Sequence, residues 1–253
     1  MDTMLILGNG GLGRAVEAAA LERLAGRTGP AASTGGVHVV GRPSTGRHDP
    51  RALPTAAVVV EASRGDAVVS NLVSALEAGS RRFVVATTGW AGDRPRVESL
   101  LQEYGAAAVV ASNFSLGVVL FGRLVETAVD MFGQLEAFDP YLLEWHRRSK
   151  RDRPSGTAMD LARRITARHP RLAGTDDLEV VSLRAGASPG MHLVGFDAAG
   201  ETIELRLTAR DRTAYAAGIL AAADWLERTP RPSGIHAFDP VVDELIARDQ
   251  IAA

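Results

Sequence analysis

The stretch that decides the fold is Met4-Leu5-Ile6-Leu7-Gly8-Asn9-Gly10-Gly11-Leu12-Gly13-Arg14-Ala15-Val16. Four apolar residues predict a buried strand, the glycines a turn, and the alanine-rich continuation a helix. Gly8 allows the tight turn, Gly10 lets the backbone approach a pyrophosphate, and Gly13 permits close packing of the helix. We therefore expect a dinucleotide to bind at Gly8, Asn9, Gly10, Gly11, Leu12 and Gly13. A glycine turn that binds nothing is the alternative interpretation.

Apolar strands and helices continue to alternate after this turn. The pattern predicts strands at residues 37–40, 56–60, 83–86 and 106–111, and helices at 66–77 and 94–104. Continuous apolar strands separated by helices indicate a parallel sheet that is covered on both faces. We expect a Rossmann-like, doubly wound α/β domain over residues 1–113.

The end of the second strand bears on the choice of cofactor. The strand at 37–40 is followed by Gly41-Arg42-Pro43-Ser44-Thr45, with no carboxylate until Asp49. An NAD site normally has an acidic residue here for the ribose 2′-hydroxyl, whereas an NADP site has a cation for the 2′-phosphate. Arg42 and Ser44 can bind a phosphate. NADPH is favoured as the cofactor, NADH stays open, and a surface arginine in a loop is the alternative.

The pattern changes after Asn113. A long apolar helix is predicted at 116–132, a strand at 141–145, an amphipathic helix at 157–168, strands at 179–184, 191–197 and 202–208, and a last helix at 215–226. Neighbouring strands joined by the turn at 198–200 are typical of an antiparallel hairpin. We expect an α+β domain for substrate binding and oligomerisation over residues 114–226, with the segment 227–253 rejoining the first domain.

Composition narrows the classes of function. The chain has 253 residues, 23% of them charged, with a formal net charge of −2, so long-range attraction to nucleic acid is not expected. The absence of cysteine excludes a disulfide framework and a thiolate metal site. Four of the histidines are scattered without the spacing of metal ligands, and we expect no metal. The longest early apolar run is too short for a signal peptide or a spanning helix, which predicts a cytoplasmic protein with no membrane partner.

A second polar segment carries candidate catalytic residues. It reads Glu144-Trp145-His146-Arg147-Arg148-Ser149-Lys150-Arg151-Asp152-Arg153-Pro154-Ser155-Gly156-Thr157-Ala158. A helix that begins near Ser155 offers backbone N–H groups and the hydroxyls of Ser155 and Thr157 to a carboxylate. Lys150 supplies a cation, and His146 can transfer a proton near neutral pH. From the residues alone, a solvated basic loop before an ordinary capped helix explains the pattern equally well.

The chain resembles the dihydrodipicolinate reductase family in several motifs that occur in the same order. The polar segment is similar to the family's signature, which ends in Asp-x-Pro-Ser-Gly-Thr-Ala. Further similarity lies at residues 86–90 (Ala-Thr-Thr-Gly-Trp), 111–118 (Ala-Ser-Asn-Phe-Ser-Leu-Gly-Val), 184–186, 190–192 and 200–205. Several ordered motifs over nearly the whole chain are more specific than any one of them.

The resemblance implies an activity and roles for named residues. The family reduces dihydrodipicolinate, formed from 4-hydroxy-tetrahydrodipicolinate, to tetrahydrodipicolinate in lysine and diaminopimelate biosynthesis. It implies a homotetramer built by the sheet of the second domain, and closure of the two domains over the substrate. The resemblance makes His146 the proton donor and Lys150 the substrate cation, assigns a substrate carboxylate to Arg147, Ser155, Gly156 and Thr157, and assigns the cofactor contacts to Thr87, Thr88, Gly89, Ser112, Asn113 and Phe114.

Three departures from the family pattern leave alternatives open. Arg147 stands where the family has a second histidine, Gly10-Gly11-Leu12-Gly13 lacks one residue of the family's glycine turn, and Met191 and Leu193 flank His192. A paralogue that reduces another carboxylated cyclic imine is the first alternative. A non-catalytic NADPH-binding sensor is the second, and the presence of both His146 and Lys150 disfavours it.

Overall fold

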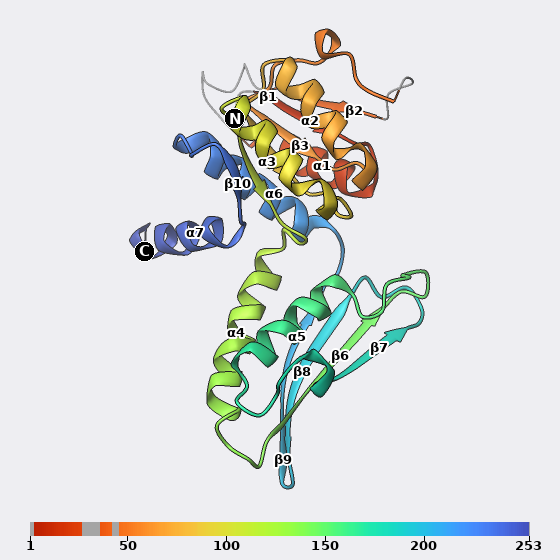
Figure 1. Cartoon of the computed structure of the whole chain (residues 1–253), viewed down its shortest axis with the longest axis vertical. Coiled ribbons are helices and arrows are strands. Elements are labelled where there is room, and N and C mark those ends of the chain that lie inside the picture. Colours follow the sequence, from red (N-terminus) through yellow and green to blue (C-terminus); the bar gives the residue numbers. More distant parts are fainter. Residues whose placement is uncertain (1–2, 27–35, 42–45, 253) are drawn as a thin grey trace. The chain divides into compact units, whose positions relative to one another are not determined.

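A computed structural model describes residues 3–26, 36–41 and 46–252, with side chains described as far as residue 248. These residues form two compact units (Figure 1). Unit 1 comprises Met1–Ser115 and Arg212–Ala253, and unit 2 comprises Leu116–Asp211. The predicted second domain, residues 114–226, differs from unit 2 at its C-terminal end, because the helix predicted at 215–226 belongs to unit 1.

Unit 1 is built on a parallel sheet of six strands in the order β10-β5-β4-β3-β1-β2. The strands are β1 (Thr3–Leu7), β2 (Gly36–Val40), β3 (Val58–Glu61), β4 (Arg82–Val85), β5 (Ala107–Val110) and β10 (Gly234–His236). The helices are α1 (Gly11–Ala25), α2 (Val68–Glu77), α3 (Arg94–Glu103), α6 (Thr213–Arg228) and α7 (Asp239–Ala252). The predicted doubly wound α/β architecture is confirmed.

Both faces of this sheet are covered, and as a consequence every residue of β1 and β3 except Thr3 is buried. Leu5, Val59 and Phe83 pack in a core with Leu72 of α2 and Leu101 of α3. Helices α1 and α6 pack on each other, and α6 packs on β3, β4 and β5. Strand β10 pairs with β5, so the C-terminal segment completes the edge of the sheet.

Unit 2 packs two helices on a mixed sheet of four strands in the order β7-β6-β8-β9. The strands are β6 (Asp139–His146), β7 (Glu179–Arg184), β8 (Met191–Ala198) and β9 (Glu201–Thr208), and the helices are α4 (Leu116–Phe132) and α5 (Gly156–Arg168). Val125 of α4, Leu161 of α5 and Phe196 of β8 share the core. Strand β6 pairs with β7 in parallel and with β8 antiparallel, which brings residues distant in sequence to one buried face.

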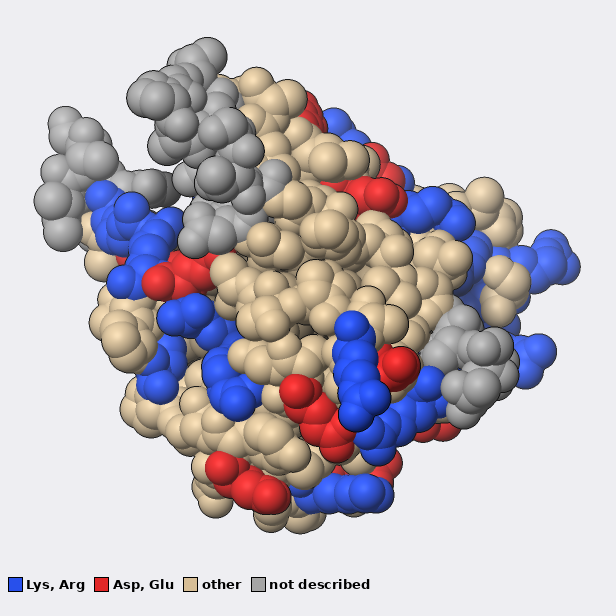
Figure 2. Space-filling view, turned by 90° about the horizontal axis from the view of Figure 1, so that it is seen from above, with Lys and Arg blue, Asp and Glu red and all other residues tan. Residues whose placement is uncertain are grey.

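The described surface carries charges of both signs. Figure 2 shows Lys and Arg lying beside Asp and Glu over one face. Among the described residues, no helix is long and apolar enough to cross a membrane.

Candidate functional site

The carboxyl ends of the parallel strands form the first candidate site. The chain leaves β1 toward β2 on one side and returns to β3 on the other, so the sheet reverses its direction of winding between β1 and β3. Ligands of open α/β sheets bind at such a switch point. A cavity of about 320 Å³ lies there, lined by Gly8, Asn9, Gly10, Gly41, Gly46, His48, Ala62, Ser63, Arg64, Asp66, Ala67 and Asn71.

Gly8, Gly10 and Gly13 of the first turn are glycines for three different structural reasons. Gly8 has a φ of +121°, and its N–H donates to the Val40 carbonyl, which ties the turn to the end of β2. A Cβ at Gly13 would collide with the Gly8 carbonyl oxygen, so α1 packs on the turn only through glycine. Gly10 caps α1 without a side-chain hydrogen bond, and a Cβ there would meet no atom within 4 Å. This open space at a helix N-terminus fits a pyrophosphate.

The other predicted cofactor residues of unit 1 follow β4 and β5. Thr87 is buried, with its Oγ1 3.2 Å from Glu61 Oε1, whereas Thr88 and Gly89 are exposed and Gly89 has a φ of +84°. Of the residues after β5, Ser112 is exposed, and the Phe114 ring is buried against Phe238 at 4.9 Å. Asn113 Oδ1 accepts from the Ser115 N–H at 2.8 Å.

Two predicted residues lie outside the described part of the chain. These are Arg42 and Ser44, on which the preference for NADPH depended. The described cavity does contain another cation, Arg64, which forms an ion pair with Asp66 at 2.6 Å. Sequence reasoning missed Arg64 because it follows β3 rather than β2.

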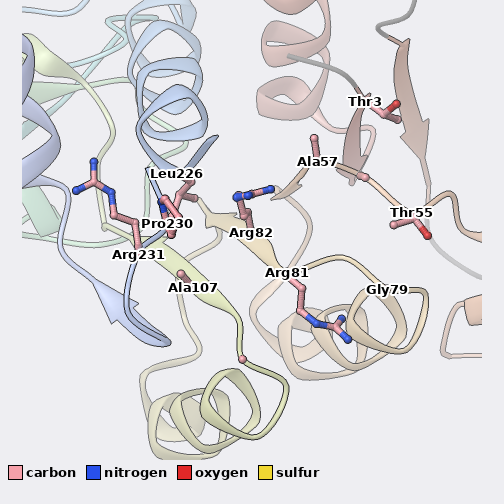
Figure 3. A pocket seen from close by; sticks show the side chains of 12 residues that line it. Thr3, Thr55, Ala57, Gly79, Arg81, Arg82, Ala107, Leu226, Pro230 and Arg231 are labelled. Atoms are coloured by element: carbon pink, nitrogen blue, oxygen red, sulfur yellow. The ribbon is translucent and has the colours of Figure 1, made fainter. Parts of the chain in front are cut away.

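A larger cavity of about 510 Å³ lies at the amino ends of the strands of the same sheet (Figure 3). Its lining includes Thr3 and Arg82 at the starts of β1 and β4, together with Arg81 and Arg231. Arg81 donates to the Leu76 and Ser80 carbonyls, and Arg231 stacks on Trp225 and pairs with Glu244. These two arginines therefore hold helix ends in place, away from the glycine turn.

The second candidate site is a buried polar network in unit 2 centred on Glu144. Its carboxylate is fully buried, and Oε1 accepts from the Ser155 N–H at 2.9 Å, Ser182 Oγ at 2.6 Å and Arg184 Nη2 at 2.7 Å. Burial alone would raise the pKa of Glu144, but these hydrogen bonds outweigh it and lower the pKa to about 2. The carboxylate is therefore ionised at neutral pH.

Two histidine rings lie beside the other oxygen of this carboxylate. Glu144 Oε2 is 3.0 Å from His146 Nδ1 and 3.8 Å from His192 Nε2, and the two rings meet edge-on with centroids 5.2 Å apart. Burial lowers the pKa of His146, and Lys150 and Arg184 add to that effect against the opposing charge of Glu144. Burial, reinforced by His146, lowers the pKa of His192 to about 4. Both rings are therefore uncharged at neutral pH before a ligand binds.

The remaining predicted substrate residues lie in the loop after β6 and at the start of α5. Lys150 Nζ is 2.8 Å from Asp152 Oδ2, and Arg147 is exposed, with its Nε donating to Ser149 Oγ. Ser155 is buried, and its Oγ accepts from the Ala158 N–H and lies 3.2 Å from His192 Nε2. Gly156 is exposed, and Thr157 is partly buried on the first turn of α5.

This group of side chains suits an anion better than a metal ion. Glu144, His146 and His192 place donor atoms within 4.8 Å of one another, as metal ligands do. However, Arg184 already neutralises Glu144, and Lys150 adds a further positive charge that both histidines sense. A dication would meet the two cations Arg184 and Lys150 here, whereas a carboxylate that displaces Asp152 from Lys150 would be attracted.

Comparison with known proteins agrees with this chemistry. Residues 117–241 match the family model of the C-terminus of dihydrodipicolinate reductase. A 4-hydroxy-tetrahydrodipicolinate reductase of Archaeoglobus fulgidus is 33% identical over 201 residues, which cover 74% of this chain and 76% of that protein. The chain belongs to the dihydrodipicolinate reductase family. The relative from Wolinella succinogenes that carries the same name is 33% identical over 198 residues, covering 72% of this chain and 74% of the relative.

The fold of dihydrodipicolinate reductases is also shared. The solved structure of a dihydrodipicolinate reductase from Paenisporosarcina sp. TG-14, with dipicolinate bound, matches with a TM-score of 0.67 at 18% identity, covering 94% of this chain and 97% of that one. Membership of this family makes the chain an oxidoreductase of the reductase type.

Sequence reasoning omitted four members of the buried network from the site: Glu144, Ser182, Arg184 and His192. The register of the sheet brings them together, because Glu144 pairs with both Ser182 and His192, and His146 pairs with Arg184. A signal was present in the sequence, since Leu142, Glu144 and His146 alternate on one face of a strand. A carboxylate and an imidazole that follow Leu142 on the same side of a strand indicate a buried polar cluster.

Proposed function

We propose that this chain reduces dihydrodipicolinate, formed from 4-hydroxy-tetrahydrodipicolinate, to tetrahydrodipicolinate, with NADPH as the preferred reductant. The observation that carries the proposal is the buried pair of His146 and Glu144 beside Lys150 and the start of α5. The names of the relatives support the reaction, and lysine and diaminopimelate biosynthesis is the pathway that these names imply.

The side chains of unit 2 suit a dicarboxylate. The substrate cation is Lys150, whose contact with Asp152 is partly exposed and can be exchanged for a substrate carboxylate. Gly156 and Thr157 are the first residues of α5, and the positive N-terminal end of a helix attracts a substrate carboxylate.

His146 is the residue that donates the proton. When bound at the glycine turn, NADPH supplies a hydride, and hydride addition to the conjugated C=N–C=C system leaves an electron pair that a proton must quench. The negative charge of a bound dicarboxylate opposes the effect of Lys150 and Arg184, so His146 gains its proton as the substrate arrives. His146 then donates that proton to the reduced ring.

The decisive experiment is turnover of enzymatically generated 4-hydroxy-tetrahydrodipicolinate, followed by the absorbance of NADPH. We expect His146→Gln to lower kcat by about 10²–10⁴-fold with little change in KM, because the amide cannot act as a general acid. Arg148→Gln, in the same exposed loop, serves as the matched control and should keep kcat. An enzyme that binds NADPH and substrate but shows no turnover would contradict the proposal.

Arg147 supports a second candidate function. It is exposed beside the site and replaces a histidine that the family pattern has, which fits a paralogue acting on another carboxylated cyclic imine. Arg147→His separates the two. In the lysine-pathway enzyme the change leaves kcat/KM for dihydrodipicolinate unchanged or lower, whereas in a paralogue it raises that value from a low starting level.

A homotetramer is part of the same proposal. The face of the unit 2 sheet away from α4 and α5 carries Tyr141, Leu143, Trp145, Val181 and Leu183, and the last two are 45% and 46% exposed. The part of this face on β6 and β7 is mainly apolar, and a surface of this kind is suited to another copy of the chain.

A further inference from the structure

The two oxygens of Glu144 have different surroundings. Oε1 receives three hydrogen bonds, from Ser155, Ser182 and Arg184. Oε2 accepts no hydrogen bond from any described residue, although it is buried, and it lies 3.0 Å from His146 Nδ1. The Nδ1 atom is likewise buried without another partner in the described chain. The ionised oxygen and the ring nitrogen are thus placed to satisfy only each other.

This placement decides where the neutral imidazole keeps its proton. An unprotonated Nδ1 would place its lone pair beside the ionised Oε2, 3.0 Å away, which is repulsive, whereas Nδ1–H is attracted to that oxygen. The contact is not aligned as a hydrogen bond in the ligand-free chain, and such contacts often tighten when substrate binds. The second ring nitrogen, Nε2, then carries the lone pair.

The surroundings of Nε2 are those of an atom left accessible to a ligand. A Cβ added at Gly190 would lie 2.9 Å from His146 Nε2, so only glycine leaves space beside this atom. On the other side, the ring of His192 packs edge-on against His146. His192 has its own contact, at 3.2 Å, with Ser155 Oγ.

We propose that Glu144 is a positioning residue that holds His146 as the Nδ1–H tautomer and thereby makes Nε2 the atom that exchanges a proton with the substrate. The last clause rests on the proposed function, whereas the tautomer does not. The charged and titratable groups around His146 are Glu144 on its own strand, Lys150 and Asp152 in the following loop, Arg184 on β7 and His192 on β8. Of these, Glu144 is the group placed against Nδ1.

The hydrogen bonds around Glu144 determine how a glutamine side chain would be oriented in Glu144→Gln. Three donors surround the position of Oε1, so the amide oxygen must occupy it to keep those hydrogen bonds. The amide NH₂ then takes the place of Oε2 and donates to His146 Nδ1. The variant therefore inverts the tautomer, and the ring proton moves to Nε2.

The test is nitrogen NMR of the full chain labelled with ¹⁵N-histidine, without ligands. The resonances of His146 are identified by their loss in His146→Gln. Above the pKa of His146, we expect a protonated Nδ1 and an unprotonated Nε2 in the parent, and the reverse in Glu144→Gln. Ser182→Ala removes a hydrogen bond from Oε1 without touching His146 and should keep the parent tautomer.

Should Glu144→Gln fail to fold, the parent spectrum still decides, because a parent His146 in the Nε2–H form overturns the proposal. An unchanged tautomer in a folded Glu144→Gln variant does the same. In turnover, the inverted tautomer should lower kcat about 10²-fold or more while KM changes little. Failure of the parent to reduce dihydrodipicolinate would count against the proposed function alone, since the spectra need no substrate.

Discussion

Glu61 is a buried carboxyl group at the carboxyl end of β3, next to the predicted nicotinamide turn. Its Oε1 accepts from Ser63 Oγ and lies 3.2 Å from Thr87 Oγ1, while Oε2 has no hydrogen-bond partner in the described chain. Burial raises the pKa of Glu61 to about 7, despite these hydrogen bonds, from an ordinary value of 4.5. The folded protein therefore retains a proton that the unfolded chain releases above pH 4.5.

This raised pKa predicts stability that falls as pH rises. Between pH 4.5 and about 7 the folded state binds more protons at Glu61, so this residue lowers the free energy of unfolding through that window by about 3 kcal/mol, whereas His48, whose pKa burial lowers, acts in the opposite direction. Glu61→Gln should remove this decrease. Urea unfolding at several pH values checks it, in a Trp145→Phe background where fluorescence reports unit 1 through Trp90 and Trp225.

Glu103→Gln, an exposed change on α3, is the matched control and should keep the parent's pH dependence. Glu144 does not interfere, because its lowered pKa affects stability only below pH 4.5. An equal slope in Glu61→Gln and the parent would contradict the assignment.

His146 predicts a difference between two pH profiles. Its pKa is lowered in the free protein by burial and by Lys150, so kcat/KM should fall as pH rises through a value below 6.5. Bound dicarboxylate raises the pKa, so the fall in kcat should come at higher pH. Lys150→Ala removes a positive charge near His146, so the fall in kcat/KM should come at higher pH. Arg148→Ala should not change the pH at which kcat/KM falls. Coincident profiles at or above pH 6.5 would show that another group donates the proton.

At the scale of elements, two glycines at the start of α1 have different roles: Gly13 is needed for packing, and Gly10 for ligand binding. Gly13→Ala should lower the free energy of unfolding by about 1–3 kcal/mol, because its methyl group collides with the Gly8 carbonyl. Gly10→Ala meets no atom within 4 Å and should leave stability unchanged, yet weaken NADPH binding about tenfold or more by filling the space for the pyrophosphate. Thermal unfolding and calorimetric titration check the pair. A Gly10→Ala variant that binds NADPH like the parent would place the phosphates elsewhere.

The helices and strands were largely predictable because their apolar patterns are strong. The strand predicted at 37–40 and the helix at 94–104 agree within one residue with β2 and α3. Strand β10 was not predicted, because three residues, Gly-Ile-His, are too few to show an apolar pattern. The helix at 215–226 was predicted as a helix but placed in the wrong unit, because an apolar stripe does not reveal which sheet it covers.

The candidate site was predictable only where its residues are consecutive. His146, Lys150 and Ser155 lie within ten positions, and a local motif reveals them. Arg184 and His192 come from β7 and β8, about 40 residues further along the chain, and only the pairing register places them at Glu144. The free energy of that network depends on burial, which no local pattern reports.

At the scale of the whole molecule, the apolar face of the unit 2 sheet predicts assembly. Val181→Lys and Leu183→Lys should each weaken association, because they place a charge among the exposed apolar side chains of β6 and β7. Light scattering during size-exclusion chromatography checks the mass. Ala167→Lys, an exposed position on α5 at the other face of the sheet, should leave the mass unchanged. A parent that is monomeric at all concentrations would contradict the proposed tetramer.

The division of unit 1 into two chain segments also affects how the protein is made. Helix α6, which covers β3, β4 and β5, is synthesised only after all 96 residues of unit 2, Leu116–Asp211. Until then, the apolar residues of β3, β4 and β5 that α6 buries have no helix to cover them, and β5 has no β10 to pair with. We expect unit 2 to be able to fold during translation, and unit 1 only near its completion. We expect these uncovered apolar segments to be what a ribosome-associated chaperone would bind.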